Sequence, residues 1–361
     1  MGRMSRDLPL ASTAMRVLVT GHHGYIGSVL APALRDAGHD VVGLDAFYFR
    51  GCDFGEDTEL EPALALDLRD VRPADLEGLD AVVHLAALSN DPLGDLNLDW
   101  TFAINRDGAI ALARAAKEAG VRRFVFASSC SMYGAAAGDA LLAEDAPLHP
   151  LTPYADSKIA AEEALQELAG DGFAPVAMRN ATVYGVSPRL RLDVVLNNLV
   201  AWAHTTGAIR LQSDGSSWRP LVHVRDVARA TTALLEAPDD AVCGEAFKIG
   251  SRAQNYRIRE LAEIVRRRLP SCQIAYAEGA SADPRSYRVD FSKFESAFPE
   301  CRFEWTAERG ADELVRAYET VGLTFDDFQG HRYIRLGQLS RLLEAGALDE
   351  DLRWAAHAAP A

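Results

Sequence analysis

The chain has few cysteines, little positive charge and no long apolar segment, and each shortage excludes a class of protein. The five cysteines are odd in number and scattered, with no C-x-x-C pair, so neither a disulfide framework nor a zinc site is indicated. A net charge of −15 argues against a nucleic-acid partner or an anionic membrane, because both require basic patches. No apolar run reaches the roughly 18 residues of a membrane-spanning helix.

What remains is an ordinary globular composition, with 48% hydrophobic and 25% charged residues among 361. This length suits one large domain or two closely joined ones. Residues 1–14 contain two arginines but lack the apolar core of a signal peptide. We therefore expect a disordered N-terminus and a reducing, cytoplasmic setting. An anionic small ligand is still compatible with the acidic charge, because a helix N-terminus can bind phosphate locally.

Short apolar strands alternate with helical patterns through the first half of the chain. This rhythm predicts an α/β fold with a Rossmann-like, doubly wound parallel sheet whose strands are covered on both faces. The predicted strands are Arg16–Thr20, Val41–Leu44, Ala81–Leu85, Phe124–Ala127 and Val176–Met178. The predicted helices are Gly24–Ala37, Ile104–Ala119 and Tyr154–Leu168.

The rhythm breaks up from about Thr182, which predicts a smaller C-terminal lobe. We assign residues 15–181 to the Rossmann domain, with a returning segment near 220–250, residues 182–320 mainly to a substrate-binding lobe, and residues 321–361 to a C-terminal extension. Helices are predicted at Val194–His204, Arg225–Leu235, Arg259–Arg268 and Asp312–Thr320, a strand at Ile209–Leu211, and a polar turn at Asp214–Arg219. The amphipathic stretch Ile334–Leu343 in the extension predicts a docked helix or a subunit contact.

A glycine loop, G-x-x-G-x-x-G at 21–27, follows the first strand and opens the first helix. In that context Gly21 permits a tight turn, Gly24 lets the backbone approach a pyrophosphate, and Gly27 lets helix and strand pack closely. The phosphates would lie at the helix N-terminus. The loop therefore predicts dinucleotide binding.

Asp45 ends the second strand about 20 residues beyond the loop, where a carboxylate binds the adenosine ribose. A carboxylate there repels a 2′-phosphate, which favours NAD over NADP. Arg50 could serve a 2′-phosphate but lies five residues further along. The alternative for Asp45 is a turn residue at the strand end. His22 and His23 are expected to shape the loop, since no third ligand makes them a metal site.

Tyr154 and Lys158 lie four residues apart on one face of a predicted helix. A free tyrosine has a pKa of about 10, and a nearby ammonium favours the phenolate. One cation near the surface is not enough to bring that pKa to about 7, so a second cation such as an oxidised nicotinamide is required.

Ser129 ends a predicted strand, where its hydroxyl would face the ligand crevice of an open α/β sheet. Because side chains alternate along a strand, Ser129 and Ser131 should share a face while Cys130 points away. A buried, inert thiol is the expectation for Cys130.

Taken together, these motifs resemble the extended short-chain dehydrogenase/reductases of the nucleotide-sugar epimerase/dehydratase group. The resemblance spans roughly residues 15–320 and rests on several motifs that occur together. They are TGHHGYIG at 20–27, Asp45, Asp67-Leu68, HLAA at 84–87, Asn105, SSCSMYG at 128–134, YADSK at 154–158 and RPLVHVRD at 219–226.

The resemblance implies a role for each matching residue. Tyr154 would be the general base, Lys158 would lower its pKa and bind the nicotinamide ribose, and Ser129 would hold the sugar hydroxyl. The implied NAD-binding residues are Gly21, His23, Gly24, Tyr25, Ile26, Gly27, Asp45, Asp67, Leu68, Leu85, Ala86, Ala87, Asn105, Tyr154 and Lys158. The implied substrate-binding residues are Ser131, Thr182, Arg219 and Arg285.

Within the second set, Arg219 would pair with the substrate diphosphate, its alternative being a surface arginine at a turn. The distal phosphate-binding arginine has two candidates, Arg285 and Arg288, and we favour Arg285. Thr182 stands where the family often has asparagine. The resemblance also implies a homodimer.

Two departures narrow the expected reaction. Dehydratases of the family have an acid pair where this chain has Cys130 and Ser131, and decarboxylases usually have Glu at the second position. Neither replacement is an acid or base near pH 7. The predicted function is therefore an NAD-dependent nucleotide-sugar epimerase acting through transient C4 oxidation of an NDP-hexose. The alternatives are an NDP-sugar dehydratase or 4-ketoreductase and, outside enzymes, a dinucleotide-sensing regulator on the same fold.

Overall fold

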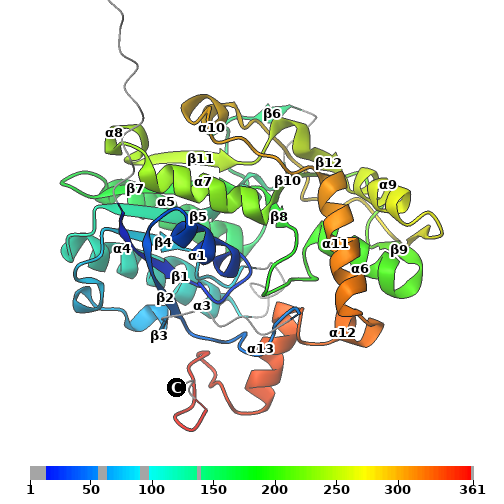
Figure 1. The fold of residues 1–361 in the computed structure, drawn as a ribbon, viewed down its shortest axis with the longest axis horizontal. Coiled ribbons are helices and arrows are strands. Elements are labelled where there is room, and N and C mark those ends of the chain that lie inside the picture. Colours follow the sequence, from blue (N-terminus) through cyan, green and yellow to red (C-terminus); the bar gives the residue numbers. More distant parts are fainter. Residues whose placement is uncertain (1–13, 56–62, 90–96, 136–139, 359–361) are drawn as a thin grey trace, which may run out of the picture.

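The computed structural model describes residues 14–55, 63–89, 97–135 and 140–358. All but the last residue of the predicted N-terminal segment 1–14 therefore lies outside the described residues. The described residues form a central seven-stranded parallel sheet in the order β11-β7-β5-β4-β1-β2-β3, which confirms the Rossmann-like prediction (Figure 1). The strands are β1 Arg16–Thr20, β2 Asp40–Asp45, β3 Ala63–Ala65, β4 Ala81–His84, β5 Arg123–Ser129, β7 Ala174–Asn180 and β11 Glu245–Ile249.

Both faces of the sheet are buried, as the short apolar strands predict. Along β1, Val17 and Val19 pack on one face with the helices α1 (Gly27–Asp36) and α7 (Val224–Glu236). Leu18 points to the opposite face, which α4 (Ala109–Glu118) and α5 (Pro153–Leu168) cover. Figure 1 shows α1 and α7 side by side against the sheet. This alternation follows from the two-residue period of a strand.

The predicted helix Ile104–Ala119 has an irregular start. Residues Phe102–Gly108 form a π-helical segment, labelled η3, and the regular α-helix begins only at Ala109. Such segments are rare and occur frequently at functional sites. Here the segment contains Asn105 and brings Gly108 against Leu68, so it packs beneath the loop that follows β3.

A second lobe has a hydrophobic core of its own. Its helices are α6 Val195–Thr206, α9 Ile258–Arg268 and α11 Ala307–Val321, and its strands include β9 Ala208–Leu211 and β13 Gln273–Tyr276. A small sheet of β8 (Thr182–Tyr184), β10 (Trp218–His223) and β12 (Asn255–Arg257) joins the lobes. The predicted turn Asp214–Arg219 is wrong at its end, because Trp218 and Arg219 pair with β12 as the first residues of β10.

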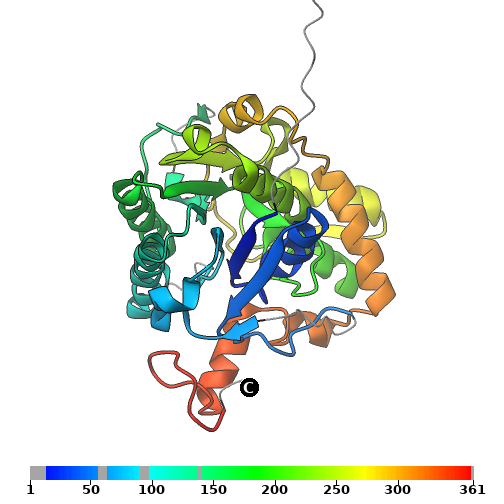
Figure 2. The same ribbon diagram turned by 60° about the vertical axis from the view of Figure 1, so that its left-hand side comes forward.

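The C-terminal segment contacts both lobes. Its first helix, α12 (Phe325–Gln329), packs on α6 of the second lobe through Phe325 and Phe328 (Figure 1). Helix α13 (Arg335–Glu344) and the residues that follow pack on the sheet lobe, and both views place them below β2 and the loop after β2 (Figures 1 and 2). Leu339 and Leu342 of α13 form an apolar cluster with Tyr48 and Ile104. Among the described residues, no helix is both long and apolar enough to cross a membrane.

The tight packing of α1 on β1 generates a stability prediction. A Cβ added at Gly27 would lie 2.3 Å from the Gly21 carbonyl oxygen and 2.5 Å from the His22 Cα. Because both neighbours are backbone atoms, Gly27→Ala should lower the free energy of unfolding by roughly 2 kcal/mol or more, measured by urea denaturation. Gly24→Ala is the control, since its Cβ comes no closer than 3.1 Å to the described atoms around it. Equal stability of the two variants would contradict this account.

Candidate active site

A cavity of about 950 Å³ opens at the carboxyl ends of the parallel strands and extends between the lobes. This is where an open α/β sheet binds its ligands, and the volume lies at the upper end for small-molecule sites. Most of the predicted site residues line it, although they come from segments far apart in the sequence. Those that line it are Gly21, Gly24, Tyr25, Ile26, Gly27, Asp45, Asp67, Leu68, Leu85, Ala86, Ala87, Ser129, Ser131, Tyr154, Lys158, Thr182, Arg219 and Arg285.

The glycine loop brings backbone, not side chains, to the cavity. Gly21 has φ +69°, and a Cβ there would lie 2.8 Å from the Ala86 nitrogen, so only glycine fits between the ends of β1 and β4. Helix α1 begins after Ile26 without a side-chain cap, and the Ser28 amide is the first to bond back, to the Gly24 carbonyl. The Gly24 amide bonds the Gly21 carbonyl at 2.9 Å, so among the described residues the amides between Gly24 and Ser28 are the ones open to an anionic ligand, as a pyrophosphate site requires.

Asp45 has two functions in the structure. Its carboxylate accepts hydrogen bonds from the amides of His23 (3.0 Å) and Phe47 (2.7 Å), so it holds the glycine loop and the loop after β2 together. Burial raises the pKa of Asp45, and the bond from the Phe47 amide opposes that rise. The carboxylate also lines the cavity. The turn-residue alternative therefore describes part of its role, and remaining lone pairs can accept from a ribose hydroxyl.

Two predicted cofactor residues, His23 and Asn105, are not among the cavity-lining residues. The ring of His23 packs on Phe47 and hydrogen-bonds Arg189, and burial followed by the Arg189 charge lowers its pKa to about 3. Asn105 bonds both backbone groups of Leu88, accepting at 2.8 Å and donating at 3.0 Å. Both residues therefore support the loops that line the cavity and do not face it.

Tyr154 and Lys158 lie on one face of α5, as their spacing predicts. The helix begins at Pro153, with Thr152 as the capping residue. The Lys158 ammonium lies 5.8 Å from the Tyr154 ring centroid and donates to the Ala127 carbonyl at 2.8 Å. Lys158 is only 2% exposed, and burial lowers its pKa to about 7. An anionic or hydroxyl-bearing ligand is what would stabilise its charged form.

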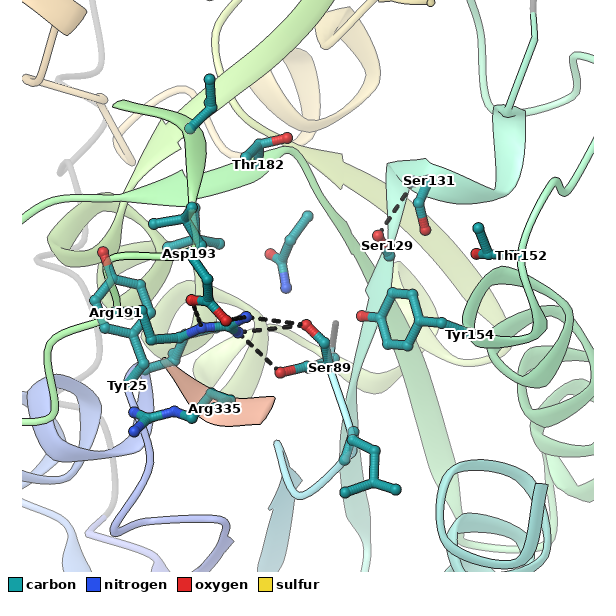
Figure 3. Close-up of a pocket in the computed structure, with 18 of the residues that line it drawn as sticks. Tyr25, Ser89, Ser129, Ser131, Thr152, Tyr154, Thr182, Arg191, Asp193 and Arg335 are labelled. Atoms are coloured by element: carbon teal, nitrogen blue, oxygen red, sulfur yellow. Dashed lines mark hydrogen bonds and ion pairs between the residues drawn. The ribbon is translucent and has the colours of Figure 1, made fainter. Parts of the chain in front are cut away.

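Ser129 and Ser131 face the cavity while Cys130 points away, as predicted, although the local structure differs (Figure 3). Strand β5 ends at Ser129, and Cys130–Tyr133 form a turn of 3-10 helix. The Ser129 hydroxyl accepts from the Ser131 amide at 3.1 Å. The Cys130 thiol is fully buried, donates to the Arg179 carbonyl, and has its pKa raised to about 12 by burial. The thiol therefore provides no acid or base to the cavity.

The second lobe contributes a cationic side to the cavity. Arg219 lies on β10 and forms an ion pair with Asp283 at 2.7 Å, and Arg285 bonds the same carboxylate at 2.9 Å. Arg219 is therefore not a surface arginine at a turn. Arg288 stacks over the Trp218 ring at 4.6 Å and is not among the lining residues, which agrees with the preference for Arg285.

The cavity also contains polar side chains that the motifs did not indicate. Arg191 pairs with Asp193 at 2.8 Å and donates to the Ser89 hydroxyl at 3.0 Å, across the cavity from Tyr154 (Figure 3). Asn180 is the last residue of β7. Its side-chain amide oxygen, Oδ1, is buried without a hydrogen-bond partner among the described residues. Arg335 enters from α13. Only the strand-end position of Asn180 gave a signal in the sequence.

Comparisons with known proteins agree with this geometry. The model of the NAD dependent epimerase/dehydratase family matches residues 17–250. This chain belongs to that family. An uncharacterized UDP-glucose epimerase, YtcB of Bacillus subtilis (strain 168), is 29% identical over 301 residues, 77% of this chain and 90% of the relative. A UDP-glucose 4-epimerase of Mycolicibacterium smegmatis is 33% identical over 254 residues, 66% of this chain and 77% of the relative.

Solved structures of similar sequence identity have the same fold. TunA, an NAD-dependent NDP-hexosamine 5,6-dehydratase of tunicamycin biosynthesis, superposes with a TM-score of 0.74 at 25% identity, over 85% of this chain and 98% of its own. MoeE5 in complex with UDP-glucose and NAD gives 0.73 at 28% identity, over 85% of this chain and 100% of its own. The residues of the cavity fit NAD, because an uncapped helix N-terminus, a strand-end carboxylate and a buried lysine are placed along it.

Burial of Lys158 generates a pH-dependent prediction for the cofactor-free protein. Its pKa is about 7 when folded and about 10.4 when unfolded, so between these values the unfolded chain binds the extra proton and stability rises with pH. Below pH 7 the whole cost of the buried charge is present. Lys158→Met should therefore be more stable than the parent protein at pH 6, by on the order of 1 kcal/mol or more, and the gain should shrink by pH 9.

Urea unfolding at both pH values measures this difference. Lys117→Met, at a less buried lysine on α4, is the control and should show no comparable pH-dependent gain. A gain for Lys158→Met that is the same at pH 6 and pH 9 would contradict the assignment of the cost to a buried charge.

Proposed function

We propose that this protein is an NAD-dependent nucleotide-sugar epimerase that acts by transient oxidation at C4 of an NDP-hexose. The observation that carries the proposal is the convergence of Tyr154, Lys158 and Ser129 in a cavity that has no carboxyl group at positions 130 and 131. Reversible oxidation at one carbon needs a base, a hydroxyl-binding group and a hydride acceptor. Elimination of water needs a further acid and base, which that turn does not provide.

The proton chemistry follows from the positions of the three side chains. Tyr154 removes the proton of the sugar hydroxyl, and Ser129 binds the same hydroxyl. Bound NAD supplies the hydride acceptor. Lys158, held by the Ala127 carbonyl, lies at 5.8 Å from the Tyr154 ring centroid and favours the phenolate. With the hydride returned to the opposite face of C4 and the proton returned from Tyr154 to the C4 oxygen, the cycle would end in the C4 epimer without net oxidation.

Carboxylates elsewhere in the cavity do not replace the missing pair. Among the described lining residues, Asp193 is engaged by Arg191, Asp283 by Arg219 and Arg285, and Asp67 by Arg69. Asp45 accepts two backbone amides at the opposite, adenosine end. These ion pairs hold arginines that can bind a diphosphate, and the substrate diphosphate is assigned to Arg219 and Arg285.

A dehydratase is the second candidate, because TunA and the dTDP-glucose 4,6-dehydratase DesIV are both 25% identical to this chain with TM-scores of 0.74 and 0.73. A 4-ketoreductase uses the same three side chains but releases the cofactor in each turnover. A non-catalytic regulator is disfavoured, because Tyr154 and Lys158 are both present at the cavity.

Incubation with a panel of UDP-, dTDP- and GDP-hexoses, followed by NMR of the products, tests the proposal. We expect a C4 epimer of one substrate without added NADH and without loss of water. A dehydrated keto-sugar as the stable product would replace the epimerase with the dehydratase. Turnover that consumes stoichiometric NADH would indicate the ketoreductase.

Tyr154→Phe tests the base directly. Loss of the phenol should lower kcat at least 100-fold, while NAD affinity measured by calorimetry stays within about threefold. Tyr276→Phe, at an exposed tyrosine of β13, is the matched control and should be fully active. Turnover by Tyr154→Phe near the parent rate would show that another group removes the proton.

A further inference from the structure

Arg335 is a buried cation that forms no ion pair with any of the residues that the structure describes. It is 4% exposed and is the first residue of α13 in the C-terminal segment. One guanidinium nitrogen, Nη2, donates to the Arg189 carbonyl at 2.9 Å, and the guanidinium lies 4.2 Å from the Phe49 ring centroid. The other, Nη1, is buried with no hydrogen-bond partner among the described residues. Burial followed by the Arg191 charge lowers the pKa of Arg335 to about 10, so it stays charged at neutral pH.

An unpaired buried guanidinium is costly, and it is found where a ligand supplies the missing anion. Arg335 lines the cavity, on the side of Tyr25 and Arg191 and across from Tyr154 (Figure 3). The nearby carboxylates are committed elsewhere, Asp193 to Arg191 and Asp45 to two backbone amides. No carboxylate among the described residues pairs with Arg335, so we look to a bound molecule for the anion.

The surroundings of Arg335 belong to the cofactor end of the cavity. Arg335 donates to the backbone carbonyl of Arg189, and the side chain of Arg189 in turn donates to His23 of the glycine loop. Phe49, on which it stacks, lies in the loop that Asp45 begins. The arginines assigned to the substrate diphosphate, Arg219 and Arg285, come instead from the second lobe. The anion nearest to the glycine loop is the diphosphate that links the two halves of NAD.

The rest of the C-terminal segment fastens the same end of the cavity. The Leu352 carbonyl accepts from the Tyr48 hydroxyl at 2.5 Å, and the Trp354 ring donates to the Ala46 carbonyl at 2.5 Å. Arg353 pairs with Asp67 at 3.4 Å, and Arg69 donates to the Asp351 carbonyl at 2.8 Å. These bonds join the segment to the loop that follows Asp45 at the end of β2 and to the loop after β3. The second loop contains Asp67 and Leu68, the residues predicted to flank the adenine.

We propose that Arg335 binds the diphosphate of NAD and that residues 335–354 form an outer wall of the dinucleotide site. The proposal rests on the NAD-dependent function above but not on which sugar is turned over. This segment lies beyond the family match at 17–250. TunA and MoeE5 are matched over 98% and 100% of their lengths yet cover 85% of this chain, so part of this chain has no counterpart in either.

Calorimetric titration of the cofactor-free protein with NAD, ADP, adenosine and UDP tests the proposal. Arg335→Gln should weaken NAD and ADP about 10- to 100-fold, the range for a lost charge-assisted bond, and leave adenosine and UDP unchanged. Arg335→Lys should recover part of the loss. Arg341→Gln, at an exposed arginine of the same helix, is the matched control and should bind all four as the parent does.

Three outcomes would overturn the proposal: unchanged NAD affinity in Arg335→Gln, an equal loss for adenosine, or a loss for UDP that exceeds the loss for ADP. The last would assign Arg335 to the substrate diphosphate. Should Arg335→Gln not fold, hydrogen exchange on the parent protein decides, because NAD must slow exchange in residues 335–354 more than adenosine does. Equal protection of residues 335–354 by NAD and by adenosine would contradict the proposal that this segment is a wall of the dinucleotide site. Failure of the epimerase proposal shows instead as absent epimer product with NAD affinity intact.

Discussion

The close contact between backbone segments at the ends of β1 and β4 is the constraint on which the site depends. Gly21 and Gly27 allow the turn after β1, the first residues of α1 and the backbone at Ala86 to approach within distances that no Cβ would permit. The Gly21 amide also bonds the Leu44 carbonyl at 2.8 Å. This packing places the end of β2, and with it Asp45, beside the open helix terminus. The predicted diphosphate and ribose sites are thus both positioned by one packing arrangement.

The cavity is locally positive although the chain as a whole is acidic. The chain carries −15 overall, yet Lys158, Arg191 and Arg335 are all buried at the cavity. Removing such charges from water is expensive, and each is compensated to a different degree. Among the described residues, Arg191 has Asp193, and Lys158 has a carbonyl, aromatic faces and the more distant charge of Glu162. Arg335 has one carbonyl and one ring. A ligand with a diphosphate and ribose hydroxyls supplies what the last two lack.

The sheet and the cofactor loop could be predicted because local rules govern them. A strand, three spaced glycines and a helix form a unit whose geometry is determined within about twelve residues, and the Tyr154–Lys158 pair needs only the period of a helix. Strand alternation was extended past Ser129 to Cys130 and Ser131, which in the structure begin a 3-10 turn that nevertheless turns both serines to the cavity. Arg219 was placed in a turn because its partner strand β12 lies 36 residues later, a pairing that no local pattern encodes.

Arg335 escaped prediction for the same reason on a larger scale. Its helix was recognisable from amphipathic spacing, but its contact with the cavity depends on tertiary packing across nearly the whole chain. The Tyr48 hydroxyl and the Leu352 carbonyl that it meets are 304 residues apart. His23 and Asn105 show the converse, since matching a motif identified residues that matter to the loops and not to the cavity wall.

The outer wall bears on the choice between reactions that share the same catalytic side chains. An epimerase returns its cofactor to the starting oxidation state within each cycle, so it gains from holding NAD between turnovers. A ketoreductase must exchange its cofactor in every turnover. The C-terminal segment is bonded to Ala46 and Tyr48 in the loop after β2 and to Arg69 after β3, and these bonds would slow that exchange. Arg335 is the residue of this segment that lines the cavity, among those the structure describes, and the apolar cluster around Leu339 and Leu342 holds its helix in place. A cofactor site closed in this way is therefore better suited to reversible oxidation at one carbon than to net reduction.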